Sequence, residues 1–223
     1  MPTNLKRIFL FANGELPAPK EILSMIKGDD YLVAVDGGLG HLTRLGLQPD
    51  LIIGDLDSAD DREVQHFRQQ GVEVRKYPVE KDETDLEIAL FAATKMKPDK
   101  IWVVAALGNR LDQTLGNIFL LSHPELAGKN IRMVDGQQEV FLIRESGDVT
   151  GKEGQRVSLL PLNGPAKGIT TAGLKYPLND ETLYPERTRG ISNCMTSENA
   201  HISLKSGLLL CIHSISNNNH RSG

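Results

Sequence analysis

Residues 51–58 read LIIGDLDS, an apolar run that ends in a glycine and two aspartates one residue apart. The run Leu51–Ile53 is typical of a strand that is buried on both faces. Because alternate side chains of an extended chain point to the same side, we expect the carboxylates of Asp55 and Asp57 to lie together. Two adjacent anions repel each other, and a bound cation is the usual way to hold them close. Carboxylates suit Mg²⁺, which typically binds one or two of them together with substrate phosphates.

Similar apolar runs lie on both sides of this segment and alternate with stretches of helical period. One apolar stripe at spacing i, i+3, i+4 and i+7 is formed by Leu86, Ala89, Leu90 and Ala93. This alternation predicts a mostly parallel sheet with flanking helices, an α/β domain over residues 1–145. Its expected strands are Ile8–Ala12, Tyr31–Val35, Leu51–Ile53, Val72–Arg75, Ile101–Ala105 and Ile131–Val134.

The pattern changes after Glu145, where Gly and Pro separate short apolar segments with no helical stripe. This pattern predicts a second, all-β domain over residues 146–216. We place the boundary in Glu145–Gly154, a glycine-rich stretch, and expect the polar tail 217–223 to be disordered. The expected strands here are Val157–Leu160, Ile169–Thr171, His201–Leu204 and Leu208–Ile212.

Composition excludes several classes of protein. The chain has 223 residues and a net charge of −4, which gives no basic footprint for nucleic acid. Its apolar runs are too short to span a membrane, so we expect no membrane partner. Only Cys194 and Cys211 are present, without C-x-x-C spacing, which favours a reducing compartment. We therefore expect a soluble, cytoplasmic protein.

Acidic residues follow four of the predicted strands. Ligands of open parallel sheets bind beyond the carboxyl ends of the strands, so these positions predict the site. Gly37 and Gly38 are expected to offer backbone N–H groups to phosphate oxygens, and Arg110 to bind a phosphate bidentately. The four segments are DGG at 36–38, GDLDS at 54–58, KDETD at 81–85 and GNRLD at 108–112.

Each segment also has an ordinary structural interpretation. Ser58 and Thr84 are each followed, three residues on, by an acid, as in a capping box, and Asp112 fits a helix N-cap. Asp36-Gly37-Gly38 fits a simple turn. The coincidence of four acid-bearing segments at one predicted sheet edge favours a phosphate and metal site over four unrelated caps and turns.

Two common phosphate-binding motifs are missing from the sequence, since neither G-x-x-x-x-G-K-[ST] nor G-x-G-x-x-G occurs. LIIGDLDS resembles the strand-plus-D-x-D nucleophile motif of haloacid-dehalogenase-type phosphatases, whose first Asp attacks phosphorus. That motif normally follows the first strand and ends in Thr or Val. Here it follows the third predicted strand and ends in Ser58.

The ordered set of motifs resembles the thiamin pyrophosphokinase family more closely. The resemblance extends into the β-rich half with GLKYPL at 173–178 and GISN at 190–193, so that it covers nearly the whole chain. The dehalogenase-type phosphatase stays open beside it, and so do two further alternatives. One is a related diphosphokinase that acts on a pterin-type alcohol, and the other is a non-catalytic nucleotide- or metal-binding module.

The resemblance implies an N-terminal α/β domain, a C-terminal β-sandwich that binds thiamine, and a homodimer. It also implies transfer of the β,γ-diphosphate of ATP to the thiamine hydroxyl, with release of AMP and with Mg²⁺ as cofactor. Asp55, Asp57 and Asp85 would surround the metal and act with Arg110 in catalysis, while Ser192 and Asn193 would hold thiamine. The residues implied to bind ATP and its phosphates are Asp36, Gly37, Gly38, Ser58, Lys81, Asp82, Thr84, Asp112 and Gln113.

The family's reaction needs a group that accepts the proton of the attacking hydroxyl, and we expect Asp85 or Asp57 to do so. Two departures from the family pattern concern the binding sites. Many relatives have Gly-Gly-Arg-x-Asp-His, where this chain has Asn109 and Gln113, and many have Glu where it has Cys194. The first departure affects the nucleotide side and the second the vitamin side.

Overall fold

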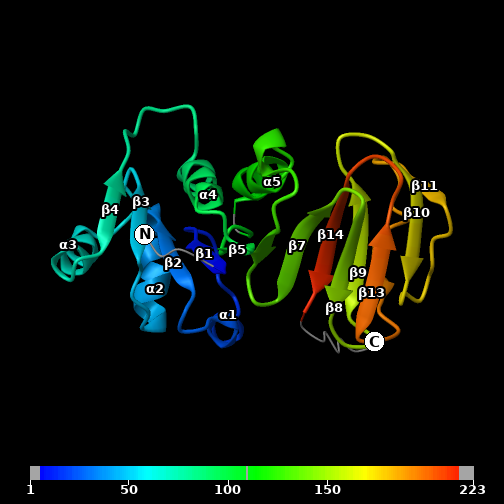
Figure 1. Cartoon of the computed structure of the whole chain (residues 1–223), viewed down its shortest axis with the longest axis horizontal. Helices are drawn as coiled ribbons and strands as arrows, with labels where there is room; N and C mark the ends of the chain where they lie inside the picture. The colour runs from blue at the N-terminus through cyan, green and yellow to red at the C-terminus, as the bar shows by residue number, and fades with distance from the viewer. Residues whose placement is uncertain (1–5, 109, 216–223) are drawn as a thin grey trace. The chain divides into compact units, whose positions relative to one another are not determined.

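A computed structural model describes residues 6–108 and 110–215. The chain divides into two compact units, Met1–Gly136 and Gln137–Gly223, which we call the first and second units (Figure 1). Among the described residues, the helices are all too short or too polar to cross a membrane.

The first unit contains a parallel sheet with the strand order β6-β5-β1-β2-β3-β4. All six strands predicted from the apolar runs are confirmed to within one residue at each end. Their bounds are β1 Arg7–Phe11, β2 Tyr31–Val35, β3 Leu51–Gly54, β4 Glu73–Lys76, β5 Lys100–Val104 and β6 Ile131–Val134.

Helices cover both faces of this sheet (Figure 1). On one face, Ile22 of α1, Leu42 of α2 and Phe67 of α3 belong to one buried cluster with Phe9 and Ile52 of the sheet. The helices of the first unit are α1 Pro19–Met25, α2 Leu39–Leu45, α3 Asp61–Gln69, α4 Asp85–Lys95 and α5 Leu111–Leu120, with short 3₁₀ turns η1 Asp36–Gly38 and η2 Pro124–Leu126.

Helix α4 packs on the opposite face, against β1, β2 and β3. The predicted stripe is confirmed, because its four apolar members are all buried. Helix α5 is different, since none of its ten residues is buried. Instead, Asn117 Nδ2 donates to the Ala106 carbonyl over 2.8 Å, and Thr114 Oγ1 donates to the Gly108 carbonyl over 3.2 Å. Polar side chains therefore fasten α5 to the loop after β5.

The second unit is an all-β sandwich of two antiparallel sheets, with strand orders β12-β9-β14-β7 and β11-β10-β13-β8. Side chains from both sheets form one buried cluster, for example Phe141 and Leu209 from one sheet and Ile169 and Ile202 from the other. The strands are β7 Gln138–Ile143, β8 Ser146–Thr150, β9 Arg156–Pro161, β10 Ala166–Ala172, β11 Glu181–Leu183, β12 Asn193–Cys194, β13 Asn199–Ser203 and β14 Leu209–Ser214.

The fold class predicted from the sequence is confirmed in both halves. The predicted boundary at 145/146 falls between β7 and β8, whereas the compact units meet at Gly136 and Gln137. The difference arises because β7 pairs with β14 and contributes Phe141 and Ile143 to the sandwich core. Tail residues 217–223 lie outside the described residues.

Candidate functional site

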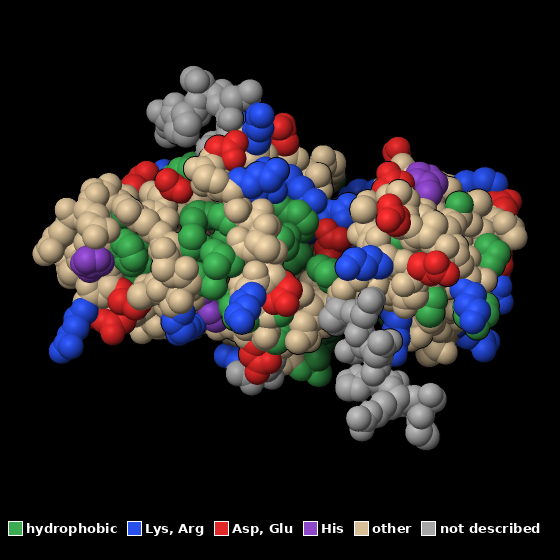
Figure 2. All heavy atoms as spheres, turned by 90° about the horizontal axis from the view of Figure 1, so that it is seen from below, with side chains coloured by type: hydrophobic (Ala, Val, Ile, Leu, Met, Phe, Trp, Pro, Cys, Tyr) green, Lys and Arg blue, Asp and Glu red, His purple; other side chains and the backbone are tan. Residues whose placement is uncertain are grey.

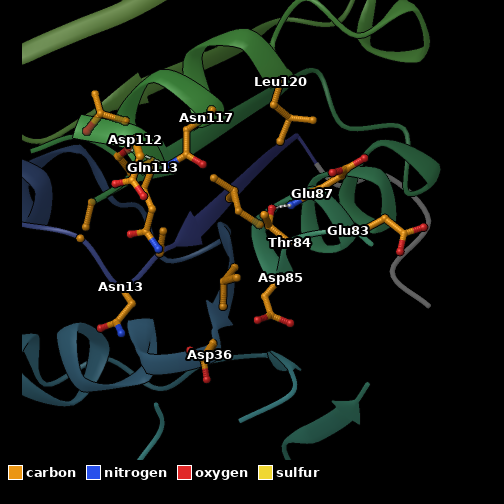
Figure 3. Close-up of a pocket in the computed structure, with 18 of the residues that line it drawn as sticks. Asn13, Asp36, Glu83, Thr84, Asp85, Glu87, Asp112, Gln113, Asn117 and Leu120 are labelled. Carbon is orange, nitrogen blue, oxygen red and sulfur yellow. Dashed lines mark hydrogen bonds between the residues drawn. The ribbon is translucent and has the colours of Figure 1, made fainter. Parts of the chain in front are cut away.

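A pocket of about 630 Å³ opens at the carboxyl ends of the strands of the first unit. Residues that follow β1, β2, β3 and β5 line it, together with the start of α4 and one side of α5 (Figure 3). The four acid-bearing segments predicted to meet at this edge all contribute lining acids, namely Asp36, Asp55, Glu83 with Asp85, and Asp112.

Three carboxylates cluster at this edge of the sheet, two of them in the pocket lining. Asp36, Asp55 and Asp57 each offer an oxygen, and these oxygens lie within 4.8 Å of one another. Asp55 is buried and Asp57 is exposed. Leu56 between them has a φ of 64°, so the segment is a turn and our assumption of an extended chain was wrong. The turn still brings the acids together, because the Asp57 N–H donates to Asp55 Oδ1 over 3.2 Å.

Asp36 joins the cluster from the end of β2. Its φ of 49° is left-handed, an uncommon conformation for a residue other than glycine. Burial raises the pKa of Asp36, although hydrogen bonds from the backbone of Gly37 and Ser58 act in the opposite direction. The two glycines that follow allow close packing. A Cβ on Gly37 would overlap the Asn13 side chain, and one on Gly38 would overlap the Phe11 carbonyl oxygen.

Lys81 lies between two of the acids. Its ammonium is 2.9 Å from Asp55 Oδ2, 3.1 Å from Asp85 Oδ1 and 3.0 Å from the Pro78 carbonyl oxygen. An ammonium has three donors, so these three oxygens can satisfy all of them. The hydrogen bond from Lys81 lowers the pKa of Asp55, against the effect of burial. Burial acts to lower the pKa of Lys81, but its bonds to Asp55 and Asp85 outweigh that effect and raise it.

Of the two residues that fit a capping box in the sequence, Thr84 caps a helix and Ser58 does not. Thr84 is the N-cap of α4, and its Oγ1 accepts from the Glu87 N–H over 3.2 Å. Ser58 is not a cap, because Asp60 fills that position for α3. Ser58 instead donates through Oγ to Asp57 over 3.0 Å and through its N–H to Asp36 over 3.2 Å. Ser58 is therefore part of the carboxylate cluster.

Helix α5 brings Asp112 and Gln113 to the pocket. Asp112 lies within the first turn, and the N-cap position belongs to Arg110, so the capping alternative for Asp112 was wrong. Arg110 donates to Asp112 over 2.6 Å, and both side chains are exposed. Asn109 lies outside the described residues. Asp82 is exposed and is not among the residues that line this pocket.

Several polar residues of the pocket were not predicted from the sequence, among them Asn13 and Asn117. Asn13 follows β1, at the same sheet edge as the acids, and Figure 3 shows its side chain on the Asp36 side of the pocket. The rule that ligands bind beyond the carboxyl ends of parallel strands predicts a site residue at this position. We considered only strand ends that carry acids and so did not predict Asn13. Asn117 lies four residues after Gln113, hence on the same helix face, and this spacing was available in the sequence.

The residues expected to bind the vitamin lie in the second unit. Ser192 has a φ of 60°, and its N–H donates to Ser158 Oγ over 3.0 Å. The side-chain amide of Asn193 pairs with the backbone of Tyr176, donating to its carbonyl over 2.7 Å and accepting from its N–H over 3.0 Å. Asn193 thus orders the loop that presents Tyr176, whose side chain is 62% exposed.

The surface around these units carries mixed charge. On the face drawn in Figure 2, Lys and Arg side chains are interspersed with Asp and Glu side chains. This is the usual arrangement of a water-exposed surface.

Comparisons with known families give two matches that together cover most of the chain. Residues 22–134 match the family model described as "Thiamin pyrophosphokinase, catalytic domain". Residues 142–209 match the model described as "Thiamin pyrophosphokinase, vitamin B1 binding domain". The two models thus correspond to the first and second units in chain order.

Individual relatives agree with the family models. The thiamine pyrophosphokinase of Bacillus subtilis is 31% identical over 216 residues, which span 94% of this chain and 99% of the relative. Thiamine pyrophosphokinase 1 of Oryza sativa is 28% identical over 76% of this chain and 67% of its own length.

Solved structures give the same result. The crystal structure of the Bacillus subtilis enzyme matches with a TM-score of 0.85 and 28% identity, over 95% of this chain and all of its own. Thiamin pyrophosphokinase from Candida albicans matches with a TM-score of 0.81 at 16% identity, over 97% of this chain and 94% of its own. The second likeness concerns the fold alone.

Proposed function

The chain belongs to the thiamin pyrophosphokinase family, and from this premise we propose that it transfers the β,γ-diphosphate of ATP to the hydroxyl of thiamine and releases AMP. The observation that carries this function is the ordered match of both family domains to the two units. The comparisons give no support to a pterin-type diphosphokinase or to a dehalogenase-type phosphatase.

We propose Mg²⁺ as the metal and assign it to the cluster of Asp36, Asp55 and Asp57. The donor set fits, because three carboxylates within 4.8 Å of one another are hard oxygen ligands around one position. The family resemblance also implies Asp85 as a ligand; we leave it outside this metal cluster and propose instead that it acts as a base. Its Oδ1 lies 3.1 Å from both Lys81 Nζ and the Asp55 N–H. When bound, the cation neutralises negative charge on the phosphates.

The chain's own residues then position the reactants. Diphosphoryl transfer needs the thiamine hydroxyl in line with the β-phosphorus, and most of the acceleration comes from orientation and charge neutralisation. We propose that Lys81 and Arg110 bind phosphate oxygens, since both are cations at this sheet edge. We propose that ATP is also bound by the backbone N–H groups of Gly37 and Gly38 and by the side chains of Asp112 and Gln113.

We assign the proton acceptor to Asp85. A carboxylate that binds a metal is a poor base, and Asp57 lies in the proposed metal cluster. Asp85 lies outside that cluster but lines the pocket at the start of α4. Asp85 therefore combines access to the pocket with a carboxylate that, in this assignment, binds no metal.

In the second unit, we propose that Ser192 and Asn193 help to hold thiamine. The proposal is supported by the hydrogen bonds between Asn193 and the backbone of Tyr176. These bonds place a polar side chain next to an exposed aromatic ring. Cys194 follows this pair, and its N–H donates to Asn193 Oδ1 over 2.9 Å. The cytoplasmic location stays a prediction from the sequence.

We also propose a homodimer, with α5 in the interface. Leu111, Leu115 and Phe119 recur every four residues on one face of α5 and are 71%, 44% and 49% exposed. An apolar stripe of this kind is typical of a surface that another protein surface covers. Light scattering should give twice the chain mass of 24.5 kDa. Leu115→Glu should give the monomer mass, whereas Leu23→Glu on α1 should not, and a wild-type monomer would refute the proposal.

Product analysis tests the activity itself. Purified protein should be incubated with ATP, Mg²⁺ and thiamine, and the products followed by mass spectrometry. We expect AMP and thiamine diphosphate in equal amounts. Formation of ADP with thiamine monophosphate, or hydrolysis of ATP alone, would contradict the proposal. A parallel incubation with a hydroxymethylpterin in place of thiamine tests the alternative substrate class.

A further inference from the structure

His41 on α2 is a buried histidine that does not line the pocket, and both of its ring nitrogens are hydrogen-bonded. Nε2 lies 2.9 Å from the Gly14 carbonyl oxygen, and Nδ1 lies 2.9 Å from Arg44 Nη2. An arginine only donates and a carbonyl only accepts, so Nδ1 must be the acceptor and Nε2–H the donor. The surroundings thus fix one neutral tautomer of His41.

The charge state of His41 agrees with this assignment. Burial lowers the pKa of His41, and the nearby charge of Arg44 lowers it further, while the bond to Gly14 acts in the opposite direction. His41 is therefore neutral and donates its Nε2–H to the Gly14 carbonyl.

The segment that His41 holds is part of the pocket wall. Two backbone bonds already tie it to β5 and the residue after it, from the Ala12 N–H to the Val104 carbonyl over 2.9 Å and from the Gly14 N–H to the Ala105 carbonyl over 2.8 Å. The bond from His41 ties the same segment to α2, in a different element of the fold.

Asn13 lies between these hydrogen-bonded positions and lines the pocket, with its side chain on the Asp36 side (Figure 3). Its side-chain amide lies so close to Gly37 that a Cβ there would overlap it. Gly37 is next to Asp36, a member of the carboxylate cluster. His41 therefore connects α2 to the residue after Asn13, whose side chain lies beside Gly37 at the acidic end of the pocket.

We propose that His41 is a positioning residue, which holds the Asn13–Gly14 segment in the geometry that the nucleotide requires. The proposal rests on the proposed function in that ATP is the ligand of this pocket. Its alternative is a buried histidine that contributes to stability alone. The two differ in whether loss of the bond weakens ATP binding beyond what loss of stability explains.

Two amide variants separate these alternatives. In His41→Gln the amide nitrogen falls near the position of Nε2, so it can donate to the Gly14 carbonyl. In His41→Asn it falls near Nδ1 and cannot reach. Thr43→Val is the control on α2, because it removes the bond from Thr43 Oγ1 to the Leu39 carbonyl, which lies within the helix and away from the pocket.

We expect His41→Asn to raise the KM for ATP by about tenfold, the effect of one lost hydrogen bond, and to change kcat by less than about twofold. His41→Gln and Thr43→Val should leave the KM near that of the wild type. Unchanged KM in folded His41→Asn would overturn the proposal, and so would an equal rise in Thr43→Val or in His41→Gln.

The Kd for ATP, measured by calorimetry, gives the same comparison without turnover. We expect the same tenfold weakening in His41→Asn alone. If the wild type binds ATP but forms no thiamine diphosphate, the proposed function fails while the comparison of the variants can still be read. If His41→Asn binds ATP as tightly as the wild type, the role of His41 fails whatever the reaction.

Discussion

Replacement of Lys81 by Met tests the electrostatics at the centre of the site. Met keeps the length of the side chain but removes the ammonium that bonds to Asp55, Asp85 and the Pro78 carbonyl at 2.9, 3.1 and 3.0 Å. Without a metal, two carboxylates would then lose their counter-ion. We expect the free energy of unfolding to fall.

The size of this loss follows from the burial of the pair. The side chains of Lys81 and Asp55 are 11% and 10% exposed. Coulomb attraction across about 3 Å is about 5 kcal/mol at an effective dielectric constant of about 20, and desolvation of the ions costs several kcal/mol against it. Breaking a fully buried pair costs about 3–5 kcal/mol, and breaking an exposed one less than about 1 kcal/mol. A pair in an open pocket lies between these limits, so we expect about 2 kcal/mol.

Mg²⁺ should reverse most of this loss. Lys81 and the proposed metal share Asp55, so removal of the lysine should strengthen metal binding. A ligand at about 100 times its Kd stabilises the folded state by about 2.7 kcal/mol. We therefore expect Lys81→Met to be less stable than the wild type in EDTA and nearly equal to it in saturating Mg²⁺.

Urea denaturation followed by circular dichroism, in EDTA and in Mg²⁺, measures these differences. Lys95→Met in the last turn of α4 is the control, because Lys95 is exposed. Its effect should stay below about 0.5 kcal/mol in both buffers. Equal stability of Lys81→Met and the wild type in EDTA would refute the reasoning. So would an equal gain from Mg²⁺ in both proteins.

Three further predictions concern the acids around the site. Asp57→Asn should abolish turnover with little change in stability, because Asp57 is exposed; activity near that of the wild type would remove it from the metal site. Asp60→Ala should cost about 1 kcal/mol through loss of the α3 cap, whereas Ser58→Ala should leave α3 intact; equal losses in urea titrations would contradict the capping assignment. The lowered pKa of Asp55 gives stability that is complete above its unfolded pKa of about 3.9 and is lost as the pH falls through the lower folded value. Asp55→Asn should therefore flatten the fall of stability with acid below about pH 4, and an unchanged acid slope would show that Asp55 has no such role.

The sequence predicts the sheet well because its signal is local. The strands of the first unit are apolar runs that need no knowledge of partners, and they lie within one residue of their predicted ends. The stripe of α4 is equally local, since Leu86 and Leu90 repeat with the helical period and both are buried. The carboxyl-edge rule then brings Asp36, Asp55 and Asp85 to one pocket.

The details of the site depend on backbone conformation and long-range contacts, which have no pattern in the sequence. The left-handed φ of Leu56 makes a turn where alternation predicts an extended segment. The bonds of Lys81 to Asp55 and Asp85 need coordinates, because residues 55 and 81 are distant in the chain. His41 belongs to none of the sequence motifs, and its link to the pocket is the hydrogen bond to Gly14.

The domain boundary shows the same limit. Glycines in 145–154 resemble a linker, but Ser146–Thr150 is strand β8 and pairs with β13. Long-range pairing of β7 with β14 sets the boundary at Gly136, and no local signal reports such pairing.

The transfer of label from ATP tests the central claim most directly. ATP that carries a radioactive β-phosphorus should be incubated with the protein, Mg²⁺ and thiamine, and the products separated. A diphosphoryl transfer predicts all of the transferred label in thiamine diphosphate and none in the AMP that is released. Label retained in ADP, with thiamine monophosphate as the other product, would contradict the assignment of this chain's reaction.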